Sequence, residues 1–285
     1  MIRLAKQADL AELTQWVYTH QHTELYSGFM SLDKARIERD LQDAITHEHV
    51  LIASKLDAQG VLIGHCDLKR AVCDLAGPYV NTHNQDLGVE LIRHWVSLQP
   101  KTVIHQFFFN RHSAYYQTLM QTLNASFQGF ESILRLDRKT FVSLPKDARV
   151  TKMQHTQKKA VEHLHNTIFK DAYLDAQTLT AVRPNHTVYV LCEAECVIGY
   201  GLMKVTGSQA SLEVFAVAEA HRGKQLSKPL ISTMIRETLR DARIETVQLV
   251  VENVNEVALN LYKRMGFSVA RENSSYHLQS QSVQD

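Results

Sequence analysis

Apolar residues recur along the chain in two periods, every second residue in short runs and every third or fourth residue in longer ones, which predict strands and helices respectively. Asp9 and Ser31 stand where the N-caps of the first two helices are expected. The first half is predicted to hold a strand, two helices, three strands, a helix, a strand, a helix and a strand, at residues 1–5, 10–17, 31–44, 50–53, 61–66, 72–80, 85–98, 102–109, 113–123 and 131–136.

The second half of the chain repeats this order of elements. Gly64 and Gly199 occupy like places in the two copies, and so do Asn110 and Asn255. The two pairs are offset by different numbers of residues because the loops differ in length. An internal duplication with different loops is the economical explanation of the repeated order. The repeated elements are predicted at residues 150–153, 159–169, 188–191, 197–201, 211–217, 226–242 and 246–251, followed by a helix from Asn255.

A charged, proline-containing stretch without either period, residues 137–149, separates the two copies. Domain boundaries fall in such stretches, so we predict two domains, at 1–140 and 150–285. The 285 residues are 45% hydrophobic, which is enough to bury a core. The net charge is +1, from 31 basic and 30 acidic residues, so no long-range field attracts nucleic acid or an anionic membrane. We expect neither as a partner.

Cys66, Cys73, Cys192 and Cys196 each lie in or beside an apolar, strand-like run, where a reduced cysteine acts as a small hydrophobe. Cys192 and Cys196 flank a predicted hairpin turn, and the 15 histidines form no ligand set at readable spacing, so no metal is expected. The first residues lack an apolar signal core, and no stretch approaches the length that crosses a bilayer. We therefore predict reduced thiols and a cytoplasmic protein.

The strand at 211–217 carries the first candidate for chemistry. Strict alternation would place Leu212, Val214 and Ala216 on one face and Ser211, Glu213, Phe215 and Val217 on the other. Glu213 therefore projects from a mostly apolar strand. Two interpretations stay open for this carboxylate: a rim group in water, or a base whose pKa is tuned for proton transfer.

The turn at 220–227 follows this strand and contains glycine and basic residues. At the N-terminus of a helix, such a turn presents unpaired backbone N–H groups and suits a phosphate or pyrophosphate, although exposed basic turns are also common. In the last helix, Ala258 and Tyr262 lie near one face, and Gly266 ends it before Phe267. Tyr262 is either a packing residue or a general acid.

Together these residues resemble the coenzyme A motifs of the GNAT superfamily of acyl-CoA-dependent N-acyltransferases, over most of the C-terminal half. The resemblance implies an α/β (α+β) fold of two tandem GNAT-like domains, each with a mixed, mostly antiparallel central sheet and helices on both faces. In this family the backbone amides of the turn hold the CoA pyrophosphate. The preceding strand splays from its neighbour, so that backbone groups bind pantetheine.

The resemblance also implies roles for individual residues, with acetyl-CoA as co-substrate. Tyr262 matches the tyrosine that protonates the leaving thiolate, and Glu213 stands on the strand whose carboxylate acts on the amine. Gln225 and Ser227 stand where the family has glycines, and Gln225 is the larger departure. The residues implied to bind the cofactor are Phe215, Ala216, Val217, Arg222, Gly223, Lys224, Gln225, Leu226, Ser227, Asn255 and Ala258.

The N-terminal half resembles the same fold in the order of its elements but not in its motifs. Its turn at 81–88 is acidic and lacks Arg-Gly-Lys, and Tyr116 is out of register with Tyr262, although Asn110 is retained. We interpret this half as a degenerate GNAT domain that has lost CoA binding and supports the other domain or walls its substrate cleft.

The sequence thus predicts an acetyl-CoA-dependent N-acetyltransferase. The C-terminal domain would transfer the acyl group to a primary amine of a small molecule or peptide by direct attack. The alternative is a non-catalytic acyl-CoA-binding or regulatory module, and a third reading is a scaffold in which Gln225 blocks CoA. The pattern does not name the amine or the oligomeric state, and a homodimer is compatible with it.

Overall fold

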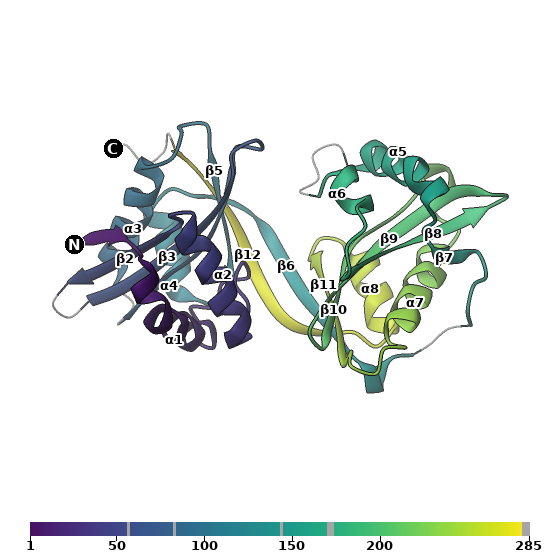
Figure 1. The fold of residues 1–285 in the computed structure, drawn as a ribbon, viewed down its shortest axis with the longest axis horizontal. Coiled ribbons are helices and arrows are strands. Elements are labelled where there is room, and N and C mark those ends of the chain that lie inside the picture. The colour runs from purple at the N-terminus through teal and green to yellow at the C-terminus, as the bar shows by residue number, and fades with distance from the viewer. Residues whose placement is uncertain (56–57, 82–83, 143–144, 170–173, 281–285) are drawn as a thin grey trace. The chain divides into compact units, whose positions relative to one another are not determined.

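The computed structural model of the chain describes residues 1–285 apart from 56–57, 82–83, 143–144, 170–173 and 281–285 (Figure 1). The chain forms two compact units. Unit 1 consists of Met1–Glu131 with Arg271–Asp285, and unit 2 consists of Ser132–Ala270. None of the described helices is both long and apolar enough to cross a membrane.

Unit 1 is a mixed sheet with helices on both faces. Its strands follow the order β1-β2-β3-β4-β5-β12, and within the described part of this unit only the pair β4–β5 is parallel. Helix α1 packs on α2, and α3 packs on α4. The elements are β1 (Ile2–Leu4), α1 (Leu10–Gln21), α2 (Lys34–Thr46), β2 (Val50–Lys55), β3 (Ala58–Asp67), β4 (Val72–Val80), α3 (Gln85–Ser97), β5 (Ile104–Asn110), α4 (Ala114–Thr122) and β12 (Ser268–Gln279).

Unit 2 has the same architecture, with strand order β6-β11-β10-β9-β8-β7. Figure 1 shows α5 and α6 on one side of this sheet and α7 and α8 on the other. Two separate apolar clusters lie on these two faces. The elements are β6 (Ser126–Asp137), β7 (Val150–Lys152), α5 (Lys158–Ile168), α6 (Ala176–Thr180), β8 (His186–Glu193), β9 (Cys196–Thr206), β10 (Gln209–Val217), α7 (Ser227–Thr238), β11 (Thr246–Glu252) and α8 (Glu256–Arg264).

The last strand of each half of the sequence contributes to the other unit. Strand β12, from the C-terminal half, pairs with β5 over Asn273–Gln279 and Ile104–Asn110 in unit 1. Residues from Ser132 onward in β6 belong to unit 2, where this strand lies beside β11. The compact units therefore cut across the chain-order domains that the sequence suggests. The periodicity predicts that a segment is a strand but does not specify its partner, and it did not predict β12.

Helix caps differ locally from the predicted ones. Helix α2 begins at Lys34 because the Asp33 carboxylate accepts the Arg36 N–H at 2.8 Å, so the prediction of Ser31 as its N-cap is wrong. The Ser31 hydroxyl instead accepts the Asp33 N–H at 3.1 Å. Asp9 does stand at the N-cap of α1, but its carboxylate bonds to groups before the helix.

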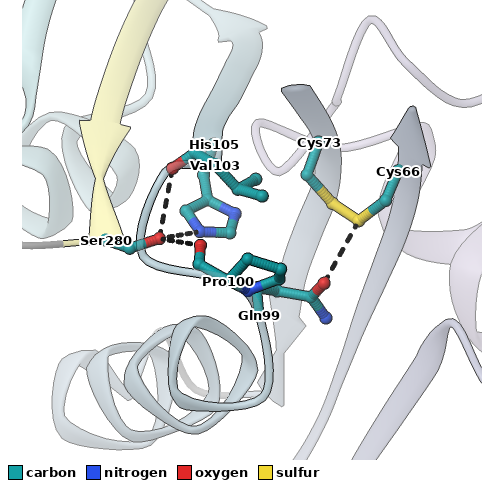
Figure 2. Close-up of a disulfide and its surroundings, with 7 residues drawn as sticks. All are labelled: Cys66, Cys73, Gln99, Pro100, Val103, His105 and Ser280. Carbon is teal, nitrogen blue, oxygen red and sulfur yellow. Dashed lines mark hydrogen bonds between the residues drawn. A yellow bond between two sulfur atoms is a disulfide. The ribbon is translucent and has the colours of Figure 1, made fainter. Parts of the chain in front are cut away.

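Cys66 and Cys73 form a disulfide, so the prediction of reduced thiols at these two positions is wrong (Figure 2). The two residues are direct partners in the antiparallel pair β3–β4, with Cα atoms 4.0 Å apart. The register of β3 against β4 brings the two cysteines together, and the apolar pattern of the sequence does not reveal this register. Cys192 and Cys196 are unpaired at the β8–β9 hairpin, as predicted. No group of three or more metal-binding side chains is found among the described residues.

Candidate functional site

The central strands of unit 2 separate from one another. Strands β10 and β11 run parallel and pair only over Gln209–Ser211 and Thr246–Gln248. Beyond Ser211, β10 pairs with β9 alone, as far as Val217. Backbone groups of β10 on the β11 side are therefore available to a ligand, because a backbone N–H or C=O needs a hydrogen-bond partner. This opening lies in the strand where the sequence places its candidate carboxylate.

A β-bulge at Glu213 changes which residues of β10 share a face. Leu212 pairs with Met203 and Val214 pairs with Leu202, so Glu213 is the extra residue. Leu212 consequently packs in the cluster beneath α7 and α8, whereas Val214 packs in the cluster of α5 and α6. The predicted common face for these two residues is wrong, because strict alternation assumes an unbroken ladder.

The turn between β10 and α7 has a backbone suited to an anion. Gly223 and Gln225 both adopt left-handed conformations, with φ of +76° and +56°. Leu226 stands at the N-cap of α7 without a side-chain cap, and among the described residues no hydrogen bond engages the backbone N–H of Gln225, Leu226 or Ser227. These donors and the positive end of the helix dipole favour a negative charge. Gln225 thus keeps the backbone conformation that a glycine would adopt most easily.

A cavity of about 530 Å³ adjoins this turn. Arg222, Lys228 and Arg264 supply positive charge to it, and no carboxylate is found among its described lining residues. The full lining is Val217, His221, Arg222, Gly223, Gln225, Leu226, Ser227, Lys228, Val257, Asn260, Leu261 and Arg264.

Six of the residues predicted to bind cofactor line this cavity: Val217, Arg222, Gly223, Gln225, Leu226 and Ser227. Five others do not line it, namely Phe215, Ala216, Lys224, Asn255 and Ala258. Sequence reasoning missed His221, Lys228 and the wall that α8 supplies. That wall consists of Val257, Asn260, Leu261 and Arg264, whose three- and four-residue spacing marks one helix face. The spacing of these four residues in the sequence could therefore have indicated this helix face.

Tyr262 lies on α8 and is 4% exposed. Its ring contacts those of Phe215 and Phe267 edge-on, with centroid distances of 6.5 and 5.6 Å. Burial raises the pKa of the Tyr262 phenol above its ordinary value, so the hydroxyl keeps its proton. Through Phe215 the tyrosine touches the opened strand. Asn255 caps the same helix, since its side-chain oxygen accepts the Ala258 N–H at 3.1 Å.

The corresponding helix of unit 1 lacks this tyrosine. Helices α4 and α8 are both 9 residues long and end alike, with Ala125 N–H donating to Met120 O and Phe267 N–H donating to Tyr262 O. Met120 therefore occupies the place of Tyr262.

By the same alignment, Ser113 is the N-cap residue that matches Asn255. The predicted match of Asn110 with Asn255 is wrong, because Asn110 is the last residue of β5 and the helix starts only after Ser113.

The strand opening of unit 1 is filled by its own chain. Strands β4 and β5 pair from Val72 to Leu75, and beyond that point the segment after α1 lies against β5. Gly28 N–H donates to Phe108 O at 2.6 Å, and Asn110 N–H donates to Tyr26 O at 3.2 Å. These bonds place the segment 26–28 beside β5, where β4 no longer pairs with it.

The N-terminus of α3 in unit 1 also differs from that of α7. Asn84 caps α3 through its side-chain oxygen, which accepts the Leu87 N–H at 3.0 Å. The side-chain amide of Gln85 donates to Tyr115 O, which ties α3 to α4. Part of the predicted acidic turn, at 82–83, lies outside the described residues. Unit 2 therefore provides the candidate site.

An α/β unit with a separated parallel strand pair and a basic cavity at an uncapped helix N-terminus defines a class of protein built to bind an anionic, extended ligand. Residues 150–267 match the model of the acetyltransferase (GNAT) family. These residues make up most of unit 2, which is therefore similar to the acetyltransferases of the GNAT family.

Solved structures share the whole fold at low sequence identity. A tandem GNAT protein from the clavulanic acid biosynthesis pathway is 12% identical with a TM-score of 0.69, covering 98% of this chain and 99% of its own. A GCN5-related N-acetyltransferase from Sphaerobacter thermophilus is 14% identical with a TM-score of 0.68, covering 98% and 95%. These likenesses show that the chain consists of two tandem GNAT-like domains. A search of curated proteins finds no significant match.

Proposed function

We propose that this protein is an acetyl-CoA-dependent N-acetyltransferase whose unit 2 transfers an acetyl group to a primary amine of a small molecule or peptide. One observation carries the proposal: the separation of β10 from β11 leads directly to the basic cavity at the N-terminus of α7. A long thioester with a pyrophosphate at its far end matches this continuous arrangement. The GNAT family model covers the same residues.

The residues present fit CoA. The backbone N–H groups of Gln225, Leu226 and Ser227 would hold the pyrophosphate, with Arg222 and Arg264 adding charge. The backbone of β10 beyond Ser211, which β11 leaves unpaired, would hold the pantetheine amides. When bound, acetyl-CoA supplies the activated acyl group of the reaction.

Two side chains are proposed to move protons. Glu213 would take a proton from the attacking ammonium, directly or through water, so that the nitrogen lone pair can form the new C–N bond. Tyr262 would give its proton to the sulfur as the C–S bond breaks, which yields free CoA thiol. The nitrogen would lose its second proton as the amide forms, and this proton would restore the phenol of Tyr262 through water. The raised pKa of Tyr262 keeps it in the protonated form that this role requires.

The experiment that tests this function pairs a calorimetric titration of acetyl-CoA with a thiol-release assay over a panel of amines. We expect binding in the micromolar range and amine-dependent release of CoA. Arg264→Ala should weaken binding by about tenfold, since a charge-assisted contact contributes ~1.5 kcal/mol. Lys263→Ala is the matched control, because this neighbouring cation on α8 is exposed and outside the cavity.

Other outcomes separate the rival functions. Binding of acetyl-CoA without thiol release from any amine would favour a non-catalytic acyl-CoA-binding module. Absence of any heat of binding would favour a scaffold without CoA binding. In that case Gln225, which lines the cavity, would exclude CoA.

A further inference from the structure

A row of polar side chains crosses four strands of unit 2. His186 on β8 pairs with Lys204 on β9, Lys204 pairs with Ser211 on β10, and Ser211 pairs with Gln248 on β11. Directly paired residues lie on the same face of a sheet, so the four side chains form one continuous line. The Gln248 amide donates to the Ser211 hydroxyl at 3.4 Å. All four residues are half-buried.

This row lies on the face opposite the basic cavity. Along β8 and β9, the next residues of the same face are Val188 and Leu202, which pack in the cluster of α5 and α6. The cavity at Arg222 instead adjoins α7 and α8. The short helices α5 and α6 bury the apolar positions of this face and leave the polar row half-exposed.

The bulge brings Glu213 into reach of this row. Burial lowers the pKa of His186, and the charges of Lys204 and Arg183 lower it further, whereas Glu213 acts in the opposite direction. Glu213 is therefore close enough to His186 to interact with it. The row ends at Ser211 and Gln248, the last paired residues before β10 and β11 separate. An acyl group bound between β10 and β11 would therefore be accessible from the α5 and α6 face, at the end of the polar row.

We propose that this polar row is the acceptor subsite and that the acceptor is a primary amine carrying a carboxylate or another anionic group. This inference rests on the proposed function. Lys204 binds the anion by charge, while the Ser211 hydroxyl and the Gln248 amide offer neutral donors beside it. Glu213 faces the amine. Two residues along a strand span roughly 6–7 Å, so the nitrogen and the anion should be separated by about four to five bonds.

The test compares initial rates of thiol release for γ-aminobutyrate, its uncharged amide and glycine at saturating acetyl-CoA. We expect kcat/KM to be at least tenfold higher for γ-aminobutyrate than for the amide or for glycine. A fourth amine, 3-aminopropylphosphonate, distinguishes a carboxylate site from a site for phosphate-like anions. A comparable rate with the phosphonate supports the shared anion chemistry, and a lower rate supports a carboxylate.

Lys204→Met should raise KM for γ-aminobutyrate about tenfold to a hundredfold and leave the rate with its amide unchanged. Calorimetry with acetyl-CoA shows whether the variant is folded, since its affinity should equal that of the wild type. Lys152→Met is the matched control, because this exposed lysine lies on β7, away from the row. If Lys204→Met does not fold, Ser211→Ala replaces it, with a smaller rise in KM for the same substrate.

Two results overturn this inference, and they differ from failure of the proposed function. Equal kcat/KM for γ-aminobutyrate and its amide overturns the anionic subsite while acetyl transfer stands. An unchanged KM in a folded Lys204→Met variant has the same meaning. Absence of thiol release with every amine overturns the proposed function and this inference with it.

Discussion

Replacing Tyr262 with phenylalanine isolates the hydroxyl group from the ring. The ring is packed against Phe215 and Phe267, and no hydrogen bond from the hydroxyl is found among the described residues. Tyr262→Phe should therefore change the unfolding free energy by less than ~0.5 kcal/mol, because no partner loses a bond and no cavity forms. Removing a general acid costs about 100-fold or more in kcat, or ~3 kcal/mol of transition-state stabilisation.

The assay measures kcat by thiol release, acetyl-CoA affinity by calorimetry and stability by thermal unfolding. We expect a lower kcat with unchanged affinity and melting temperature. Tyr116→Phe is the control: its hydroxyl donates to Leu25 O at 3.0 Å in unit 1, so its loss should cost about 1 kcal/mol of stability and no activity. Unaltered turnover in Tyr262→Phe would refute the proton-donor role.

Three further predictions concern stability. Gln225→Gly should raise the unfolding free energy by about 1 kcal/mol in a denaturant titration, because Gln225 has a φ of +56°. The control is Lys224→Gly, which should lower the unfolding free energy because Lys224 does not have a positive φ. Gly266→Ala should lower it by about 2 kcal/mol or more, since a Cβ there would lie 2.5 Å from the Thr140 carbonyl oxygen at a φ of +96°. Burial lowers the pKa of His105 to about 4, so the folded protein resists its protonation. The unfolding free energy should therefore fall by ~3 kcal/mol as the pH decreases from 6.5 to 4. A pH series of unfolding midpoints in which His105→Gln has the same slope as the wild type would contradict this.

Much of unit 2 was predictable from local patterns. The hairpin at Cys192 and Cys196, the buried strand of β11 and the helix that Asn255 caps are all set by residues close in sequence. The anion-binding turn was equally readable, since a glycine and basic residues before an amphipathic helix act through nearby backbone groups. Six predicted cofactor residues accordingly line one cavity. The catalytic roles of Tyr262 and Glu213 stay predictions until kinetics test them.

The features that the sequence did not reveal depend on contacts between distant segments. A single extra residue at Glu213 breaks the alternation of β10, because the ladder with β9 shifts there. The Cys66–Cys73 disulfide requires the register of β3 against β4. A cytoplasmic location also stays a prediction, and this disulfide removes one of the arguments for it.

The sequence by itself determined the duplicated order of elements, the turn at the N-terminus of α7 and the family that these motifs indicate, because propensities, periodicity and turn chemistry act over a few residues. The sequence also predicted that the C-terminal half binds the cofactor, but only the tertiary structure showed how the strand opening differs between the two units. In unit 2 the separation of β10 from β11 leaves backbone groups available, whereas in unit 1 the segment around Gly28 bonds to β5. Pairing between segments tens of residues apart follows from packing and register, and a one-dimensional pattern does not specify it.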